Sequence, residues 1–415
     1  MRRVFTAILA IGSACLMTSC ATHRRTDRAS HLSSEIGEYY RNTAGVEAVK
    51  TEQPEIYDGG LEIRKKMLEL INEATDYILI DSFLVTSIGP ALDVLDALKA
   101  KQDEGVRVYI LTDFSVRYVP EEDAFAYLEE IGIPYAEYNP LTVSKLILMP
   151  VLLARDHRKF WVVDGKVLFL GGANINESSL TSREDGGNRD FMIAVKSPEA
   201  VSEMISAFVK TWNRSSSMQL KQSDFAVQGE PSKEVRMWLF NQQFEGETAN
   251  VVPMVDGLFA MAQKEIWILQ AYAFVNPDLI KMIKTASERG VSVNFVFGEP
   301  VRYQRFRYAS YYGIKNILKA GGKVWVCESG TSPLHYKSIL VDDNLVEMGS
   351  ANLNFRSYHL SKETNLVIED KVSARKIRGT LQEFLKNSRQ VTREEAKQYR
   401  GLRYSLGWLL MQFGG

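Results

Sequence analysis

The pattern of apolar and polar positions runs through the same series twice along the chain. In the first copy, residues 57–74 carry apolar residues at helical spacing and lead into an uninterrupted apolar run at 76–85. A second amphipathic stretch, 89–105, precedes the apolar run 106–114. The series returns at residues 255–264, 265–274, 276–290 and 291–300. Helical spacing predicts helices, and short apolar runs between them predict buried strands.

Each copy closes with one more strand and helix, residues 190–197 and 198–212 in the first and 363–370 and 371–385 in the second. Alternating strands and helices predict an α/β fold whose sheets are covered on both faces. We therefore expect two duplicated lobes, each a mostly parallel β-sheet flanked by helices, packed with pseudo-twofold symmetry. A repeat of this length indicates duplicated domains and not a solenoid.

The lobes are assigned to residues 51–215 and 251–390, with a linker or insertion at 216–250, where the role of residues 235–250 is left open. The tail, residues 391–415, is strongly apolar and includes Trp408 and Phe413. It is too short to span a bilayer, so it suits a helix at the membrane interface or one that docks on the core.

The N-terminus resembles an export signal. Residues 1–19 combine two arginines, a short apolar stretch and small residues before Cys20, which together predict a lipoprotein signal peptide. Cys20 would then be acylated and residues 20–50 would form a tether, placing the protein on a membrane outside the cytoplasm. Because Ala21 is not acidic, we expect the periplasmic face of the outer membrane. Ordinary secretory cleavage near Ala21 is the alternative.

Cysteine content and charge narrow the possibilities. Beyond Cys15 and Cys20 only Cys327 remains, so no disulfide can form within the mature chain. The formal net charge is −1, with 50 basic and 51 acidic residues. A nucleic-acid-binding protein usually carries a strongly basic face, so this balance makes nucleic acid an unlikely partner.

Two stretches, residues 152–176 and 334–354, contain matching polar residues at identical spacing. The matched pairs lie 178 positions apart: His157 and His335, Lys159 and Lys337, Asp164 and Asp342, Gly171 and Gly349, Gly172 and Ser350, Asn174 and Asn352. One His-x-Lys is usually a surface accident, but this set, repeated inside duplicated lobes, indicates a site.

Within each stretch, histidine and lysine two residues apart on a strand point to the same face, whereas the aspartate points to the other. Imidazole, ammonium and amide groups on one surface suit a phosphate. If the lobes bring the two copies together, one imidazole attacks phosphorus while the other protonates the leaving oxygen. The lysines and asparagines stabilise the transition state without a metal or other cofactor, and Asp164 and Asp342 are structural.

These residues match the signature HxKxxxxD followed by GxxN, and the chain therefore resembles the phospholipase D superfamily from about residue 55 to 390. The segment GSANLNFRSYHLSKETNLVI, residues 349–368, is similar to the second motif of the bacterial cardiolipin synthase-like branch. That pattern commonly has Asp where this chain has Asn354, and Asn where it has Ser361.

The resemblance implies a two-step phosphodiester exchange at a shared site between the lobes. In it, His157 is the nucleophile that forms a phosphohistidine, and His335 is the general acid and then the base. Lys159, Lys337, Asn174 and Asn352 hold the phosphoryl oxygens. The family's carboxylate positions match Glu363 and Asp190, which we pair with His157 and His335 respectively.

The motifs do not choose between a phospholipid and a nucleic acid. The apolar run 146–154 is a candidate acyl-chain groove or a buried strand, and the apolar tail also favours lipid. Arg302, Arg305 and Arg307 alternate with aromatic residues and could contact nucleic acid or anionic headgroups. We expect a membrane-anchored phospholipase D-type phosphodiesterase or phosphatidyltransferase. An extracytoplasmic nuclease is the alternative, and a scaffold with a dead site is a third possibility.

Overall fold

The structure is a computed structural model of the full chain. It describes residues 36–118, 124–140, 154–230, 232, 234–243, 250–299, 304–327 and 332–412. The predicted signal peptide, Cys20 and most of the apolar run 146–154 lie outside the described residues, as do Arg302 and Phe413.

The first lobe is built on a seven-stranded sheet of order β2-β8-β7-β6-β3-β4-β5. Its strands are β2 (Glu55–Asp58), β3 (Tyr77–Ser82), β4 (Arg107–Asp113), β5 (Tyr135–Tyr138), β6 (Lys159–Val163), β7 (Val167–Gly171) and β8 (Phe191–Val195). Its helices are α3 (Gly60–Glu73), α4 (Gly89–Asp103), α5 (Ala124–Ile131), α7 (Glu177–Leu180) and α8 (Pro198–Ser215).

The second lobe repeats this order as β9-β15-β14-β13-β10-β11-β12 and adds β1 and β16 at its two edges. Its strands are β1 (Val49–Thr51), β9 (Val235–Gln242), β10 (Glu265–Gln270), β11 (Ser292–Gly298), β12 (Lys323–Cys327), β13 (Lys337–Val341), β14 (Leu345–Gly349), β15 (Glu363–Glu369) and β16 (Ser388–Gln390). Its helices are α2 (Ile36–Ala44), α9 (Val251–Met261), α10 (Pro277–Glu288), α11 (Gln304–Lys319), α12 (Phe355–His359), α13 (Lys371–Lys386) and α14 (Leu402–Met411).

The expected α/β fold with two duplicated lobes is confirmed, but the expectation of mostly parallel sheets is wrong. Only β3-β4-β5 and β10-β11-β12 run parallel, and every other pair is antiparallel. The motif strands β6 and β7 form a hairpin through Asp164 and Gly165, both at positive φ. Asp-Gly between apolar runs predicts such a hairpin. The strands are buried on both faces, which hides the alternation usual in antiparallel sheets.

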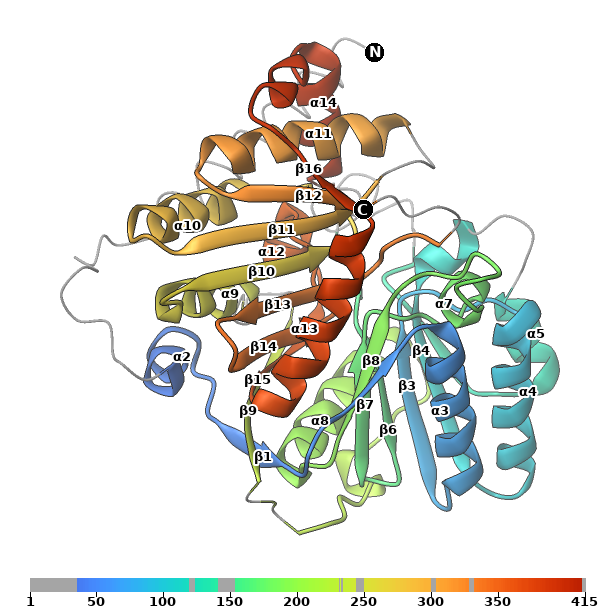
Figure 1. Ribbon diagram of the computed structural model, residues 1–415. Coiled ribbons are helices and arrows are strands. Elements are labelled where there is room, and N and C mark those ends of the chain that lie inside the picture. Colours follow the sequence, from blue (N-terminus) through green and yellow to red (C-terminus); the bar gives the residue numbers. More distant parts are fainter. Residues whose placement is uncertain are drawn as a thin grey trace.

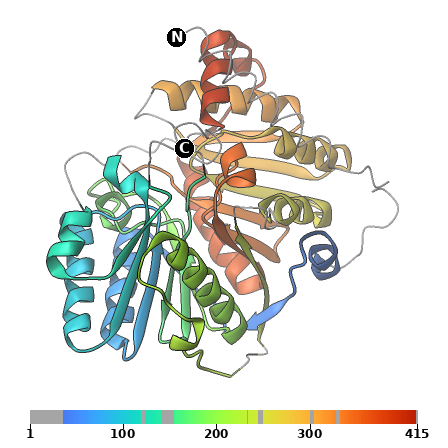
Figure 2. The ribbon, with the colours of Figure 1, turned by 180° about the vertical axis from the view of Figure 1, so that it is seen from behind.

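Three large apolar cores position the site, and only the third of them joins the two lobes. One lies between α3, α4 and the first sheet, and another between α9, α10, α11 and the second sheet. The third joins residues of both lobes, with α8 and α13 between the two sheets, as Figures 1 and 2 show. Phe208 of α8 and Phe384 of α13 belong to this shared core, each no more than 2 % exposed. The lobes are therefore packed as one body by apolar burial.

Two boundaries differ from those expected from the sequence. Residues 235–242, within the expected linker, form β9, which pairs with β15 inside the second sheet. The described part of the expected tether is also folded, because β1 pairs with β9. Tyr40 of α2 packs edge-on against Trp238 and Phe240 of β9. These short elements carry too few residues for periodicity to reveal them, and they gain their stability from packing on the second lobe.

The apolar tail forms α14, which crosses α11 at the far end of the second lobe (Figure 1). The indole Nε1 of Trp408 donates to the Val275 carbonyl oxygen at 2.9 Å. The helix therefore docks on the core through one face, which was one of the two expectations for the tail. Among the described helices, none has the length and apolar content needed to cross a membrane.

Candidate active site

The first histidine is placed by a backbone contact that crosses between the lobes. His157 lies just before β6, and its amide donates to the Lys362 carbonyl oxygen at 3.0 Å. The Lys362 amide donates in return to the Arg155 carbonyl oxygen at 2.9 Å. Lys362 immediately precedes Glu363, the first residue of β15. This bridge therefore sets the histidine of the first lobe opposite a carboxylate of the second.

The second histidine is placed by the equivalent bridge. The His335 amide donates to the Arg189 carbonyl oxygen, and the Arg189 amide donates to the Pro333 carbonyl oxygen, both at 2.8 Å. Arg189 immediately precedes Asp190, the residue just before β8. The two isolated bridges, Asp156–Lys362 and Arg189–Leu334, are therefore equivalent to each other with the roles of the lobes reversed, as a local twofold axis requires.

Both imidazoles bind the carboxylate that the opposite lobe supplies. His157 Nδ1 lies 3.2 and 3.1 Å from the two carboxylate oxygens of Glu363. His335 Nδ1 lies 2.6 Å from Asp190 Oδ2. These are the two pairings that the family resemblance implied. In a neutral imidazole that donates through Nδ1, Nε2 carries the lone pair that can act as nucleophile or base.

The two carboxylates are held differently. The Ser350 hydroxyl donates to Glu363 Oε2 at 2.5 Å. At the equivalent position in the first motif, a Cβ on Gly172 would come within 2.2 Å of Asp190 Oδ1. Asp190 cannot yield without leaving His335, so this position requires glycine. The Gly-Gly and Gly-Ser versions of the motif thus match the two carboxylates that they hold.

Burial and the lysines keep both imidazoles neutral in the resting protein. Burial, with the positive charge of Lys159, lowers the pKa of His157 to about 3 although Glu363 opposes the shift. Burial and Lys337 likewise lower the pKa of His335. A neutral imidazole is the form that can attack phosphorus, so the electrostatics of the site favour a nucleophile.

Both motif lysines are buried beside the histidines. Lys159 Nζ donates to the His157 carbonyl oxygen at 2.6 Å, and Lys337 Nζ donates to the His335 carbonyl oxygen at 2.8 Å. Burial lowers the pKa of Lys159 to about 7, with Lys337 acting in the same direction against the pull of Glu363. Burial also lowers the pKa of Lys337. Two cations forced together in this way favour an anion between them.

The motif asparagines occupy equivalent turns. The backbone amide of Asn174 donates to Ser179 Oγ, and the backbone amide of Asn352 donates to Ser357 Oγ, both at 3.2 Å. The side-chain carbonyl of Asn174 accepts from the Leu84 amide at 3.2 Å, which commits its oxygen and leaves its NH₂ group as the donor.

The motif aspartates lie away from the histidines, at the turns after β6 and β13. The Asp164 carboxylate accepts the Thr75, Asp76 and Tyr77 amides. The Asp342 carboxylate accepts three amides in the same way, from residues 263–265. Both residues have φ of 51°, and their carboxylates tie the hairpins to the chain before β3 and β10. Their place is structural.

Sequence reasoning missed several residues of the site. The Phe83 ring lies edge-on to the His157 ring at 4.9 Å between centroids, and Lys159 Nζ lies 5.0 Å from its centre. Phe83 directly follows β3, at the carboxyl end of a parallel strand, where ligand-binding residues commonly lie. This position was the signal in the sequence that could have identified it. Among side chains near the site, Arg356 is partly buried and acts electrostatically on His157 and Glu363.

A buried ionic cluster lies next to the first motif only. Arg158 Nη2 lies 2.8 Å from Asp81 Oδ2 and 2.5 Å from Asp156 Oδ2. It also donates to Thr211 Oγ1, as does Lys362 Nζ. Burial, with the nearby Asp156, raises the pKa of Asp81 well above its usual value. The second motif has Leu334 and Tyr336 at the positions of Asp156 and Arg158, so the two halves of the site differ beneath their histidines.

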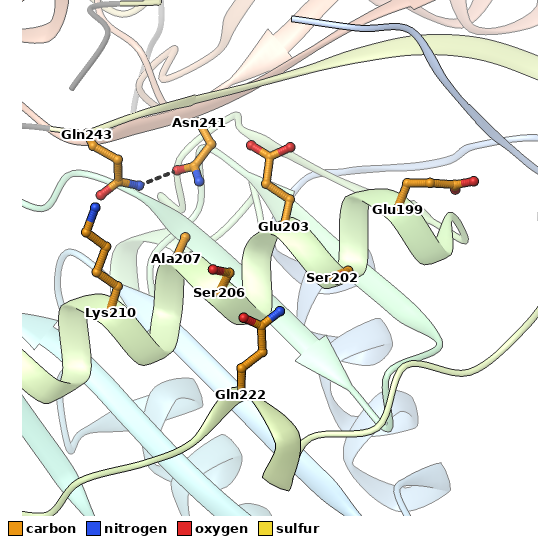
Figure 3. A pocket seen from close by; sticks show the side chains of 9 residues that line it. All are labelled: Glu199, Ser202, Glu203, Ser206, Ala207, Lys210, Gln222, Asn241 and Gln243. Carbon is orange, nitrogen blue, oxygen red and sulfur yellow. Dashed lines mark hydrogen bonds between the residues drawn. The ribbon is translucent and has the colours of Figure 1, made fainter.

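A separate cavity of about 440 Å³ lies between α8 and β9, as Figure 3 shows. Its lining is polar, and on the wall formed by β9, Gln243 Nε2 donates to Asn241 Oδ1 at 2.8 Å. Burial raises the pKa of Glu203, another lining residue, to about 6. The lining includes no histidine and neither motif lysine, so it offers no equivalent of the paired imidazoles.

Across the described ranges, no group of three or more His, Cys, Asp or Glu has the arrangement of a metal site.

Comparison with known proteins relates the chain to one family. The family model described as "Cardiolipin synthase, PLD-like domain" matches residues 67–212 and 256–385, which contain both motifs. The chain is 26% identical over 341 residues to cardiolipin synthase 1 of Staphylococcus aureus (strain COL), covering 81% of this chain and 68% of that protein. It is also 26% identical over 337 residues to cardiolipin synthase 2 of Bacillus anthracis, covering 80% of this chain and 64% of the relative.

Among solved structures, the crystal structure of phosphatidylserine synthase from Haemophilus influenzae Rd KW20 superposes with a TM-score of 0.69 at 17% identity. The superposition covers 91% of this chain and 97% of that one, which shows that the two share a fold.

Proposed function

The chain belongs to the phospholipase D superfamily, in its cardiolipin synthase-like branch, and from this premise we propose that it transfers or hydrolyses phosphatidyl groups of phospholipids through a phosphohistidine. The observation that carries the proposal is the exchange of partners between lobes. Each imidazole is bound by the carboxylate of the opposite lobe. The two lysines flank them, so the groups that a phosphodiester exchange requires meet at one interface.

In the first step, His157 Nε2 forms a bond to phosphorus as the bond from phosphorus to the leaving alcohol oxygen breaks. Glu363 stabilises the positive charge that develops on this imidazole. The leaving oxygen takes a proton from His335. A bound phosphodiester brings negative charge next to His335, which raises the pKa of this imidazole and allows it to carry that proton.

In the second step, His335 removes a proton from the incoming hydroxyl group. The oxygen of that group attacks phosphorus, and the bond to His157 breaks. Water gives a phosphatidic acid, whereas the hydroxyl group of a second lipid gives a larger phosphodiester. The His157 side chain is 6% exposed and that of His335 is 22% exposed. The more open imidazole is the one that must meet the incoming hydroxyl group.

We also propose that the enzyme is a lipoprotein, anchored through Cys20 to a membrane outside the cytoplasm, at the periplasmic face of the outer membrane. The small residues before Cys20, after an arginine pair and an apolar stretch, support this. Such an anchor would hold the site next to a lipid substrate.

Mass spectrometry of lipids tests the proposed function. Purified protein is incubated with vesicles of phosphatidylglycerol and phosphatidylethanolamine, and separately with plasmid and single-stranded DNA. We expect phosphatidic acid or a new diphosphatidyl lipid, and intact DNA. Degraded DNA with unchanged phospholipids would instead establish the nuclease alternative. A double variant, His157→Ala with His335→Ala, controls for contaminating activity.

A further inference from the structure

Helix α14 presents leucines to solvent on the side opposite its docked face. Tyr404, Gly407 and Met411 are buried against the second lobe. Leu402, Leu406 and Leu410 are 78%, 38% and 52% exposed. Residues four apart share one side of a helix, so the three exposed leucines form a stripe. We call this stripe the leucine row.

The leucine row is unlike the other exposed apolar positions. In the part of the chain that the structure describes, the remaining large exposed apolar residues are scattered over five separate segments: Leu61, Ile88, Met218, Val227 and Val372. Single exposed apolar residues are ordinary on a protein surface, whereas several gathered on one element indicate a contact surface.

The docked face of α14 is fixed, so the leucine row cannot turn inward. Gln412, after the last turn, accepts the Phe355 amide on Oε1 at 3.1 Å and donates from Nε2 to the Phe274 carbonyl oxygen at 2.9 Å. Its own carbonyl oxygen accepts the Arg356 amide at 2.9 Å. This end of the helix therefore joins the segment that follows Asn352, beside the second motif.

Positive charges gather at the opposite end of α14. Arg400 precedes the helix, and its charge, together with that of Lys319, lowers the pKa of Lys315 after the larger effect of burial. Arg403, in the first turn, covers the Tyr308 and Tyr404 rings at 5.2 and 4.9 Å. Among the described residues, no carboxylate lies within 4 Å of these four cations, whereas the nearby Lys397 pairs with Glu394. We call the four residues the cation cluster.

We propose that the leucine row and the cation cluster together form a surface that docks on an anionic phospholipid bilayer. Leucine side chains enter the acyl region at the interface, and lysine and arginine bind acidic headgroups. A second copy of this chain fits the surface less well. A stable dimer buries about 800 Å² on each partner, and three partly exposed leucines offer much less apolar surface than that.

Docking in this orientation would bring the bilayer to the end of α14 that contacts residues 355–356, next to the second motif. The inference rests on the proposed function for its purpose, since it names the surface that presents the lipid. Membrane binding itself does not depend on catalysis and can be measured alone.

The first experiment uses the full-length protein with an environment-sensitive fluorophore on Leu406→Cys. Leu61→Cys on α3, also exposed, is the matched control, and the parent protein treated with the same dye gives the background from native cysteines. Vesicles of phosphatidylglycerol should shift the emission of the label at 406 to the blue and leave that at 61 unchanged. Pure phosphatidylcholine should give a smaller shift. No shift at 406, or equal shifts at both positions, would overturn the proposal.

The second experiment compares the triple variant Leu402→Gln, Leu406→Gln, Leu410→Gln with a control triple, Leu61→Gln, Met218→Gln, Val372→Gln. Each leucine that enters the bilayer contributes about tenfold in affinity, so turnover on vesicles should fall at least tenfold in the first triple only. Turnover on a short-chain soluble phosphodiester should remain. Equal loss on both substrates, or a change from dimer to monomer without change on vesicles, would reject membrane docking.

The two experiments separate this inference from the proposed function. A blue shift at 406 with no phospholipid turnover in the parent protein would retain the docking surface and remove the proposed activity. Turnover in the parent protein without a shift would do the reverse.

Discussion

The two histidines are chemically alike but differ in their surroundings. Glu363, behind His157, accepts a hydroxyl hydrogen bond from Ser350, and the Phe83 ring lies edge-on to the His157 imidazole. Asp190, behind His335, is held by the Phe191 amide at 2.9 Å. Different surroundings for equivalent groups fit different tasks in one reaction.

Removing either imidazole should separate the two tasks. His157→Ala should abolish turnover and the covalent phosphoenzyme, because no other described group takes the position of its Nε2. His335→Ala should abolish turnover of substrates with poor leaving groups, yet still form the adduct with an activated ester that needs no proton. Acid-quenched protein analysed by mass spectrometry detects the adduct. Full activity of His157→Ala would refute the assignment.

The lowered pKa of Lys159, about 7, predicts that anion binding takes up a proton. At pH 8 the free site holds Lys159 mostly neutral, and a bound dianion offsets the burial and the charge of Lys337 that lower this pKa. Sulfate does not titrate in this range and serves as the probe. Calorimetry in buffers of different ionisation enthalpy should show proton uptake by Lys159 at pH 8, in addition to any uptake by His335, and little contribution from Lys159 at pH 6.

The matched variant Lys159→Gln should bind sulfate more weakly and take up fewer protons at pH 8. Uptake that is the same in this variant and in the parent protein would place the titrating group elsewhere.

At the scale of residues, identical spacing in duplicated lobes predicted the equivalent motif positions, and the family resemblance implied which carboxylate pairs with which histidine. It did not predict Phe83, Arg356 or the cluster of Arg158 with Asp81. These residues reach the site through the packing of separate segments, and no repeat marks them. The sequence shows that Ser350 replaces the glycine found at the equivalent position of the first motif. Its hydrogen bond to Glu363 was not predictable, because that bond depends on the turn that places the serine.

Among the elements, α14 links the far end of the second lobe to the second motif. Gln412→Ala should lower the free energy of unfolding by about 1–3 kcal/mol, since the buried Phe355 amide and Phe274 carbonyl lose their partner. It should also lower turnover on a soluble substrate, because α12 follows the motif. Urea denaturation and steady-state kinetics measure both.

Gln398→Ala, at an exposed position of the preceding turn, is the control and should change neither quantity. If Gln412→Ala changes stability alone, α14 supports the fold and not the site. These hydrogen bonds also explain why point substitutions in the leucine row test membrane docking better than removal of residues 401–415.

Element types were predictable where apolar patterns are long, and the direction of strands was not. Continuous apolar runs arise in any sheet covered on both faces, so β6 and β7 gave no sign of their antiparallel pairing beyond the Asp164–Gly165 turn. Strand β9 was not predicted from the sequence, because its partner β15 is more than 120 residues away and no local signal records the pairing.

At the scale of the whole molecule, residues 20–35 separate Cys20 from the start of α2. A fully extended stretch of this length reaches roughly 55 Å, on the order of the diameter of a lobe. An acylated Cys20 therefore leaves enough chain for the α14 surface to reach the same bilayer.

Acylation is the testable part of this arrangement. The protein expressed in a bacterium with its signal intact should incorporate labelled fatty acid and fractionate with membranes, and Cys20→Ala should incorporate no label. Cys15→Ala, within the predicted signal peptide, is the matched control and should still be labelled. Label that persists in Cys20→Ala would reject the lipoprotein assignment.

The two bridges between the lobes have a consequence for hydrogen exchange. The amides of His157 and Lys362, and those of Arg189 and His335, are protected by carbonyl oxygens across the lobe boundary. Each can exchange with solvent deuterium only when that boundary opens, whatever the state of the sheets on either side. These four amides are therefore built-in reporters of lobe separation. Opening that breaks the site should give these four amides one common free energy of opening, distinct from that of amides inside β6 or β13.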